Sequence, residues 1–272
     1  MINKNYLEDL NKSKEPFIIY KSGNGFDLYT NFSKKIILTN SNIEKFINES
    51  TKLKSKKKKT DLFIGFFGYE ILNNLIGVKI KKKKGFKFPK GIFYKPESKQ
   101  KLPNKLNYKN LGIVKSNKLF KININKASYK VIFDKFKKKI KSGETYQTKI
   151  CTKYRNKAQI DALDFFCRLV KSNMAPEAFL IRDKDYSIIS CSPENLITKK
   201  NDIITTKPIA GTLKKTKKLN KIKALAFFKR NIKENKEHNM IVDMERSDLS
   251  KICKAGSVKI LKKKIVEEYK DL

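Results

Sequence analysis

Pro208-Ile209-Ala210-Gly211-Thr212 and Glu234-Asn235-Lys236-Glu237-His238 are the two most informative stretches of this 272-residue chain. The second ends the longest predicted helix, residues 222–238, where a spacing of three places Glu234 and Glu237 on one face. Two neighbouring carboxylates repel each other unless a cation or proton lies between them, and their oxygens suit Mg²⁺. In a lysine-rich helix, however, such a pair is more often a solvated face. His238 is equally compatible with a packing or capping role and with a catalytic one.

Short strands and a few helices are grouped along the rest of the chain, a pattern typical of an α+β protein. Apolar residues at helical spacing predict amphipathic helices over residues 127–141 and 162–170. Lysine, proline and glycine dominate residues 79–121, which we expect to form loops around one or two strands. The other predicted strands are residues 17–20, 35–38, 62–70, 145–154, 178–181, 187–190, 196–198 and 203–206.

The composition indicates a folded chain that can bury a core. Hydrophobic residues make up 39% of the sequence and aromatic residues 11%, although tryptophan is absent, and the length suffices for one large domain or two smaller ones. Four dispersed cysteines without a Cys-x-x-Cys pair argue against a zinc site or a disulfide framework and favour a reducing compartment. The sequence contains no signal peptide and no apolar run of membrane length, so we expect a cytoplasmic protein without a membrane partner.

The formal net charge of +38 allows two interpretations. Clustered lysine attracts the phosphates of nucleic acid, and a non-catalytic basic nucleic-acid-binding protein is therefore one hypothesis. Alternatively, the whole sequence has drifted toward lysine, asparagine and isoleucine. Only five arginines are present, although arginine is preferred for reading bases, and the lysine runs are scattered. These two facts favour drift, so nucleic acid is not the expected partner, although the charge can help to draw in an anionic substrate.

Five motifs in a fixed order resemble those of the chorismate-utilising enzymes, the family of the large subunits of anthranilate synthase and aminodeoxychorismate synthase. Each motif is short, but their order and spacing make the resemblance specific, and together they extend over nearly the whole chain. The motifs are Gly65–Glu70, Gly143–Gln147, Ser190–Glu194, Pro208–Thr212 and Lys233–Leu249.

The resemblance implies a fold and a division of the chain. The fold is an α/β sandwich of complex topology, like that of anthranilate synthase component I, in which a hydrophobic strand at residues 240–242 follows the longest helix. Residues 1–121 correspond to the N-terminal subdomain, and residues 122–272 to the first part of the chorismate-binding catalytic domain. In the family, further catalytic motifs follow the segment that Val266–Tyr269 matches. The implied fold is therefore C-terminally incomplete, and we expect exposed apolar faces and strand edges.

The resemblance also implies roles for particular residues. Glu234 and Glu237 would supply part of the Mg²⁺ site that holds the carboxylates of chorismate. Glu194 would be the general acid that assists loss of the ring hydroxyl, a task that needs a partly neutral carboxylic acid. Gly211 and Thr212 would bring backbone and hydroxyl donors close to the substrate, and Thr212 would also take part in catalysis.

Two positions bear on the type of reaction. Relatives that add water carry a lysine base where this chain has Gln147, so Gln147 at this catalytic position indicates the branch that uses ammonia. Ala210, in the substrate-binding segment, stands where one group of aminodeoxychorismate synthases has a nucleophilic lysine. In this respect the chain resembles anthranilate synthase or the relatives without that lysine. The segment 173–177 and the pair Glu245-Arg246 favour aminodeoxychorismate synthase narrowly.

The predicted function is that of the large subunit of an aminodeoxychorismate synthase-like enzyme, which aminates chorismate with Mg²⁺ and ammonia for 4-aminobenzoate and folate synthesis. In this family a separate glutamine amidotransferase subunit supplies the ammonia. Anthranilate synthase component I, which serves tryptophan synthesis, is the alternative within the family. The nucleic-acid-binding hypothesis, on a decayed or truncated copy of the fold, is the alternative of another class.

Overall fold

A computed structural model describes residues 6–51, 60–78, 88–108, 120–156, 158–173 and 175–269. The chain divides into two compact units, one formed by Met1–Lys109 with Ala162–Leu272 and the other by Asn110–Asp161. Part of the predicted loop region, residues 79–121, lies outside the described residues. Among the helices of the described ranges, none is both long and apolar enough to cross a bilayer.

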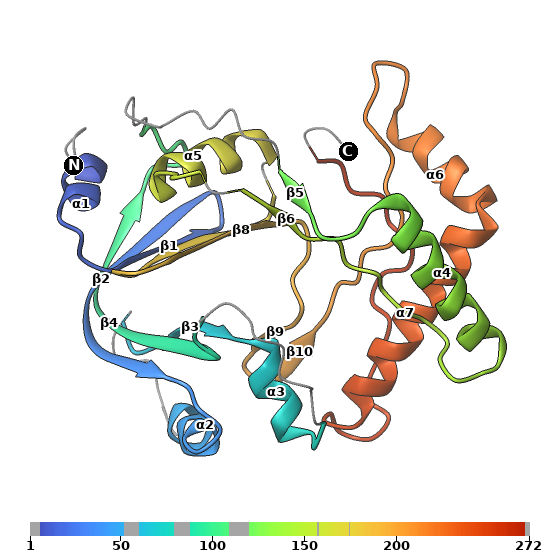
Figure 1. Ribbon diagram of the computed structural model, residues 1–272, viewed down its shortest axis with the longest axis horizontal. Coiled ribbons are helices and arrows are strands. Elements are labelled where there is room, and N and C mark those ends of the chain that lie inside the picture. Colours follow the sequence, from blue (N-terminus) through green and yellow to red (C-terminus); the bar gives the residue numbers. More distant parts are fainter. Residues whose placement is uncertain are drawn as a thin grey trace. The chain divides into compact units, whose positions relative to one another are not determined.

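The first unit is built on a six-stranded antiparallel sheet (Figure 1). Its strand order is β3-β4-β2-β1-β7-β8, so the pairing of β1 with β7 joins parts of the chain that are far apart in sequence. Four of these strands precede residue 121 in the sequence and two follow it. The predicted division of the chain into two parts at residue 121 stays a prediction. The six strands are β1 (Phe17–Ser22), β2 (Gly25–Ile37), β3 (Ile64–Phe67), β4 (Gly91–Leu102), β7 (Glu177–Arg182) and β8 (Ser187–Ser192).

A tight turn between β1 and β2 sets the register at the centre of the sheet. Gly23 in this turn has a φ of +59°, a conformation that glycine adopts without strain, and only two residues separate the paired strands. Side chains then alternate between the two faces of the sheet. Phe17 and Ile19 belong to the apolar cluster on one face, and Ile18 and Tyr20 to the cluster on the other.

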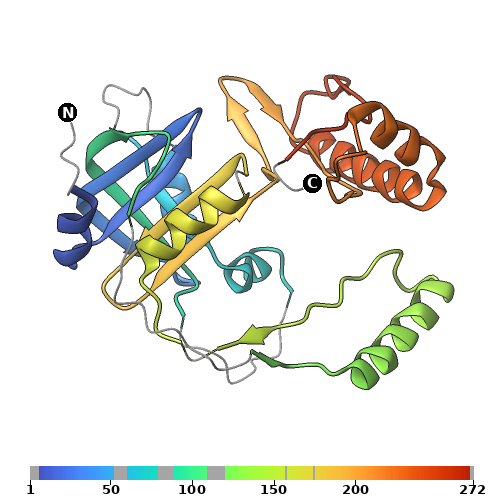
Figure 2. The same cartoon turned by 90° about the horizontal axis from the view of Figure 1, so that it is seen from above.

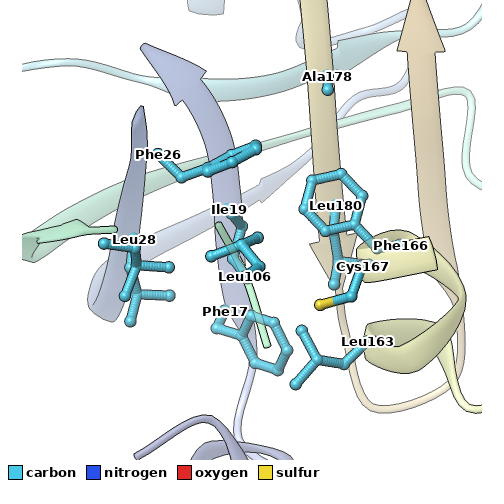
Figure 3. Close-up of a cluster of buried hydrophobic side chains, with 11 residues drawn as sticks. Phe17, Ile19, Phe26, Leu28, Leu106, Leu163, Phe166, Cys167, Ala178 and Leu180 are labelled. Carbon is cyan, nitrogen blue, oxygen red and sulfur yellow. The ribbon is translucent and has the colours of Figure 1, made fainter. Parts of the chain in front are cut away.

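Helix α5 (Ala162–Asn173) covers one face of the sheet and confirms the helix predicted over residues 162–170. Figure 3 shows Leu163 and Phe166 of this helix pointing toward the apolar side chains of the strands. The Phe166 ring meets the Phe26 ring edge to face, with centroids 6.0 Å apart. Burial of this apolar surface is the main force that stabilises the unit. The buried members of the cluster are Phe17, Ile19, Phe26, Leu28, Leu102, Leu106, Leu163, Phe166, Cys167, Ala178 and Leu180.

Further helices pack apolar side chains around the β3 end of the sheet. Phe46 and Ile71, from two different helices, belong to one buried cluster there. The backbones of β3 and β4 approach so closely that a Cβ added to Gly65 would lie 1.9 Å from the carbonyl oxygen of Ile92. Only glycine fits at residue 65 without a backbone shift. The helices at this end are α2 (Ile43–Thr51) and α3 (Tyr69–Leu75), whereas α1 (Tyr6–Lys12) packs against the cluster that α5 covers.

A buried carboxylate, Asp27 of β2, lies against two lysines of the neighbouring strand β4. Its oxygens lie 2.9 Å from Nζ of Lys99 and 2.6 Å from Nζ of Lys101. Burial alone would raise the pKa of Asp27, but the hydrogen bonds from Lys101 and Lys99 outweigh burial and hold the pKa below its usual range. The carboxylate is therefore charged and paired at neutral pH.

The rest of the first unit, residues 193–269, is a small hairpin, two helices and an irregular final segment. Figure 2 shows the two helices side by side, and they contact each other. All residues of this range are described, and Ala224 is the only one that is buried. The elements are β9 (Thr198–Lys200), β10 (Ile203–Thr205), α6 (Lys221–Arg230) and α7 (Ile232–Ser250).

The longest predicted helix, residues 222–238, is two helices in the structure. Asn231 ends α6, where its N–H donates to the carbonyl of Phe227, and begins α7, where its side chain accepts from the Glu234 N–H. The strand implied at residues 240–242 is wrong, because these residues continue α7. A short apolar run does not distinguish a strand from a helix, and the charged residues around it are good helix formers.

The second unit, residues 110–161, contains one long helix that confirms the helix predicted over residues 127–141. The strand predicted over residues 145–154 is wrong for most of its length, because only its end pairs with another strand. Apolar alternation alone does not make a strand where no partner strand supplies hydrogen bonds. Among the described residues of the unit, the elements are β5 (Lys121–Ile122), α4 (Lys126–Lys141) and β6 (Tyr154–Arg155).

Candidate functional site

A cavity of about 1400 Å³ lies within residues 193–269 of the first unit. Its wall includes the loop of residues 206–213, one side of α7 and the segment 257–269 that follows the helix. The two sequence motifs around residues 208–212 and 234–238 therefore meet in space at one cavity. The predicted site residues in its wall are Ala210, Gly211, Thr212 and Glu234.

Gly211 allows the loop to lie directly against α6 and α7. Its φ of +79° is in the left-handed region that favours glycine. A Cβ at this position would lie 2.7 Å from Cε1 of Phe228 and 3.1 Å from Oε2 of Glu234. The backbone of the loop can therefore approach the carboxylate of Glu234 because residue 211 has no side chain.

The Ser192-Pro193-Glu194 turn is hydrogen-bonded to the same loop. The Ile209 N–H donates to Oε1 of Glu194 at 2.7 Å. Within the turn, the Glu194 N–H donates to Oγ of Ser192 at 3.2 Å, and this hydroxyl donates to the Glu194 carbonyl at 2.8 Å. Pro193 is part of the cavity wall, and its carbonyl accepts from the Tyr269 hydroxyl at 3.1 Å. Glu194 is exposed and does not itself line the cavity, but one of its oxygens is fixed to a residue that does.

Glu234 and Glu237 lie in the first turns of α7, but only Glu234 lines the cavity. The Glu234 side chain is 24% exposed, and its N–H donates to the side chain of Asn231 at 3.2 Å. Glu237 is half-buried outside the cavity wall. The sequence interpretation missed Asn231, although an asparagine three residues before a glutamate is a signal for the start of a helix.

This pair of glutamates is compatible with part of a Mg²⁺ site. Magnesium in proteins is often held by one or two carboxylates together with water and substrate oxygens. Within the described ranges, no group of three or more His, Cys, Asp or Glu side chains could hold a metal ion. Glu234 and Glu237 would therefore need oxygen ligands from elsewhere, which a substrate with carboxylates can provide.

Cationic side chains outnumber acidic ones around the cavity. Its wall contains eleven lysine and arginine residues but five aspartate and glutamate residues. Lys207 pairs with Glu267, and Lys215 lies 2.9 Å from Glu268. The remaining excess of positive charge attracts anions. The cationic residues are Lys199, Lys207, Lys215, Lys221, Lys229, Arg246, Lys254, Lys259, Lys262, Lys263 and Lys264.

His238 lies in the cavity wall one helical turn after Glu234. Its Nδ1 is buried and has no hydrogen-bond partner in the part of the chain that the structure describes. Burial lowers the pKa of His238, and the charge of Lys264 lowers it further. The imidazole is therefore neutral at pH 7 and can both accept and donate a hydrogen bond at the cavity.

Gln147 belongs to the second unit, residues 110–161. Its side chain is exposed, and its backbone carbonyl accepts a hydrogen bond from the Thr145 hydroxyl at 3.0 Å. These contacts are local to the unit, and the catalytic role of Gln147 stays a prediction.

A family profile matches almost the whole chain, and individual relatives match about half of it. A family profile described as chorismate binding enzyme matches residues 5–272. A stretch of 151 residues is 34% identical to anthranilate synthase component 1 of Arthrobacter globiformis, and it covers 53% of this chain and 28% of that protein. Another of 137 residues is 33% identical to aminodeoxychorismate synthase component 1 of Bacillus subtilis (strain 168), covering 50% of this chain and 29% of that protein. The matched stretches thus span less than a third of these two relatives.

A solved structure is similar in fold. Anthranilate synthase component I from Streptococcus pneumoniae TIGR4 matches with a TM-score of 0.64, covering 90% of this chain and 62% of that chain at 22% identity. At this identity the likeness concerns the fold alone. It confirms the predicted α+β fold of the anthranilate synthase component I type.

Proposed function

Because the chain belongs to the family of chorismate-binding enzymes, we propose that it acts as the large subunit, component I, of an aminodeoxychorismate synthase-like enzyme. The reaction would replace the ring hydroxyl of chorismate by an amino group, with ammonia as the nitrogen source, for 4-aminobenzoate and folate synthesis. Anthranilate synthase component I is the second candidate. The fold of chorismate-binding enzymes does not fit the nucleic-acid-binding alternative.

The observation that carries this proposal is the meeting of three separate motifs at one cationic cavity. The Glu194 turn is hydrogen-bonded to Ile209, and Gly211 of the same loop lies against Glu234. The excess of lysine in the cavity wall suits chorismate, which carries two carboxylates. The carboxyl group of Glu194 is therefore hydrogen-bonded to the wall of a cavity whose excess of lysine attracts anions.

Glu194 is proposed as the general acid of the reaction. Loss of a hydroxyl needs a proton on the departing oxygen, and a positioned carboxyl group can supply it. The Ile209 N–H holds Oε1 of Glu194 and so orients the carboxyl group. The second oxygen, Oε2, would carry the proton that moves to the leaving hydroxyl.

The loop and the start of α7 would hold the substrate. The backbone of Ala210 and Gly211 and the hydroxyl of Thr212 provide hydrogen-bonding groups at the cavity wall. Glu234 and Glu237 would hold Mg²⁺. When bound, Mg²⁺ would neutralise carboxylate charge of the substrate.

Two residues support an amination rather than a hydration. Gln147, a neutral amide, cannot act as a base toward water, so ammonia is the expected nucleophile. Ala210 offers no amine that could form a covalent intermediate with the ring, so ammonia would attack directly. Relatives of both names match at similar identity, 34% and 33%, so the choice between the two products rests on the sequence features at residues 173–177 and 245–246.

The proposed partner is a glutamine amidotransferase subunit that supplies ammonia, and the proposed location is the cytoplasm. The test would start from the protein purified from its natural source, with chorismate, Mg²⁺ and an ammonium salt, which replaces the amidotransferase. We expect consumption of chorismate, and mass spectrometry then distinguishes aminodeoxychorismate from anthranilate. No binding of chorismate in the presence of Mg²⁺, measured by calorimetry, would reject the proposal.

Substitutions of the three glutamates sharpen this test. Glu194→Gln removes the proton donor and is expected to lower turnover about a hundredfold or more with the fold intact. Glu234→Gln and Glu237→Gln should abolish Mg²⁺-dependent turnover, and unchanged turnover would contradict the metal assignment. Glu97→Gln, an exposed glutamate of β4, is the matched control and should leave turnover unchanged. Wild-type turnover in Glu194→Gln would contradict the assignment of the acid.

A further inference from the structure

Glu177, the first residue of β7, connects the six-stranded sheet to the turn that carries Glu194. We propose that Glu177 is a positioning residue that fixes this turn to the sheet through Asn195 and so sets the position of the Glu194 carboxyl group. The catalytic consequence rests on the proposed role of Glu194 as general acid. The contacts of Glu177 with Tyr20 and Asn195 hold the turn to the sheet whatever the role of Glu194.

Both oxygens of the Glu177 carboxylate accept hydrogen bonds, and the two donors come from different elements. The Tyr20 hydroxyl donates to Oε2 at 2.8 Å, and the Asn195 side-chain amide donates to Oε1 at 3.0 Å. Tyr20 belongs to β1 in the middle of the sheet, whereas Asn195 lies just beyond the end of β8. The carboxylate therefore links a rigid strand to the turn.

The register of the strands explains why these side chains meet. Tyr20 lies opposite Phe179 in the pair of β1 and β7, and Glu177 is two residues before Phe179, hence on the same face. Glu177 also lies opposite Ser192, the last residue of β8. It is thus placed where the sheet ends and the turn begins.

Glu194 is consequently held between two anchored residues. On one side, the hydroxyl of Ser192 bonds to both the N–H and the carbonyl of Glu194. On the other side, Asn195 is bound to Glu177, and its Oδ1 accepts from the Thr198 hydroxyl at 3.4 Å. Without the Glu177 contact, the turn keeps its internal hydrogen bonds but loses this link to the sheet.

The surroundings of Glu177 suit a structural acceptor and not a substrate ligand. Burial, reinforced by the hydrogen bond to Glu177, raises the pKa of Tyr20 to about 12, so the phenol remains a proton donor at any ordinary pH. Glu177 is half-buried and does not line the cavity. Its influence on catalysis would therefore pass through the geometry of Glu194, which affects the reaction step more than substrate binding.

The test compares Glu177→Ala, which removes both acceptors, with Tyr20→Phe, which removes only the donor on the sheet. Two quantities are measured on the full chain: the rate of amide hydrogen exchange at Ile209, and kcat and KM for chorismate with Mg²⁺ and ammonium. Tyr29→Phe is the matched control, because the hydroxyl of this tyrosine of the adjacent strand donates to a different carboxylate, that of Asp27.

We expect Glu177→Ala to raise the exchange rate at Ile209 and to lower kcat about tenfold, with KM within about twofold of wild type. Tyr20→Phe should also raise the exchange rate at Ile209 and lower kcat, each by about threefold. Tyr29→Phe should change neither quantity. Unchanged exchange at Ile209 in Glu177→Ala would overturn the proposal. Equal effects in Tyr29→Phe would overturn it too, because the loss would then reflect the sheet as a whole.

Swapping the donor and the acceptor between residues 177 and 195 distinguishes loss of this hydrogen bond from a general loss of structure. Asn195→Asp alone places two carboxylates about 3 Å apart, so it should disturb the turn more than Glu177→Ala does. Combining it with Glu177→Gln restores a hydrogen bond of reversed direction between the two positions. Recovery of slow exchange at Ile209 in the double variant supports the proposal, and a double variant as disturbed as Asn195→Asp contradicts it.

Failure of this proposal and failure of the proposed function give different results. A wild-type protein that neither binds nor consumes chorismate would reject the proposed function. In that case the exchange rates of Ile209 still decide whether Glu177 holds the turn. A protein that consumes chorismate with the same kcat before and after Glu177→Ala keeps its function and rejects the positioning role.

Discussion

The six-stranded sheet and residues 193–269 belong to one unit of the chain, yet they are stabilised in different ways. In the sheet and its covering helix, side chains such as Phe17, Phe166 and Leu180 are completely buried. In residues 193–269 Ala224 is the only buried residue, while Leu261 is 82% exposed and Ile222 is 76% exposed. One region has a close-packed core, and the other has very little apolar burial.

This difference shows where rigidity comes from in the candidate site. The sheet keeps its shape through burial of apolar surface, a large and cooperative effect. Residues 193–269 rely on helix caps, loop hydrogen bonds and exposed ion pairs, each of which contributes about 1 kcal/mol or less. Local opening should therefore be much easier in the site region than in the sheet. The link through Glu177 is important because it joins the weaker region to the stronger one.

The largest contrast is expected from one substitution made in both regions. Phe166→Ala removes a buried ring of α5 and should lower the free energy of unfolding by about 4 kcal/mol. Phe227→Ala removes a ring of α6 that is 45% exposed and should cost less than about 1 kcal/mol. Urea unfolding followed by circular dichroism measures both. Similar losses for the two variants would show that Phe227 also packs in a core.

Two glycines give the next contrast. Gly65→Ala places a methyl group against the Ile92 carbonyl and should cost about 3 kcal/mol of unfolding free energy, measured by urea unfolding. Gly211→Ala strains the left-handed backbone and crowds Phe228, which should cost about 1 kcal/mol but weaken chorismate binding, measured by calorimetry. Unchanged stability in Gly65→Ala would mean that the β3 strand shifts freely, against the idea of a rigid sheet.

Charge pairs should show the same contrast, with a buried pair in the sheet contributing more to the free energy of unfolding than an exposed pair in residues 193–269. Asp27→Asn leaves Lys99 and Lys101 without their carboxylate and should cost about 2 kcal/mol at pH 7. Because the pKa of Asp27 is lowered in the folded state, its contribution is present above about pH 4 and is lost as the pH falls through the lowered pKa. The unfolding free energies of wild type and variant should therefore converge in acid. Asp243→Asn, at the exposed pair with Arg246, should change nothing measurable.

The smallest effect is expected at Leu261. Because this side chain is 82% exposed, Leu261→Ser should change the free energy of unfolding by less than about 0.5 kcal/mol. Thermal unfolding of both proteins measures the difference. A loss above about 1 kcal/mol would show that another polypeptide covers Leu261 in solution, and the contrast between the two regions would then be smaller than it is in the isolated chain.

The sequence predicted the fold well where local periodicity and motif order carry the information. The helices at residues 127–141 and 162–170 are confirmed, because their apolar residues recur at a helical period over several turns. The strands predicted at residues 145–154 and 240–242 are wrong, because one lacks a pairing partner over most of its length and the other continues a helix. Short apolar runs do not contain that information.

For the candidate site, the order of the motifs anticipated which residues meet at the cavity, including Gly211 and Glu234. The sequence could not reveal that Tyr20 and Glu177 meet, since their pairing depends on strand register across the sheet. Nor did it show that Glu237 lies outside the cavity wall. Such details depend on the exact turn of a helix and the end of a strand, which tertiary packing determines.

The pairing of β1 with β7 also sets the order in which the chain can fold during its synthesis. Tyr20 and Glu177, which meet across this pair, are 157 residues apart in the sequence. At a synthesis rate of about 5–20 residues per second, β1 would wait on the order of ten to thirty seconds for its partner. Throughout that interval one edge of the central hairpin is open to pairing with other nascent chains. A ribosome pause between these residues would prolong this exposure, so the yield of folded protein should depend on translation speed over residues 23–177.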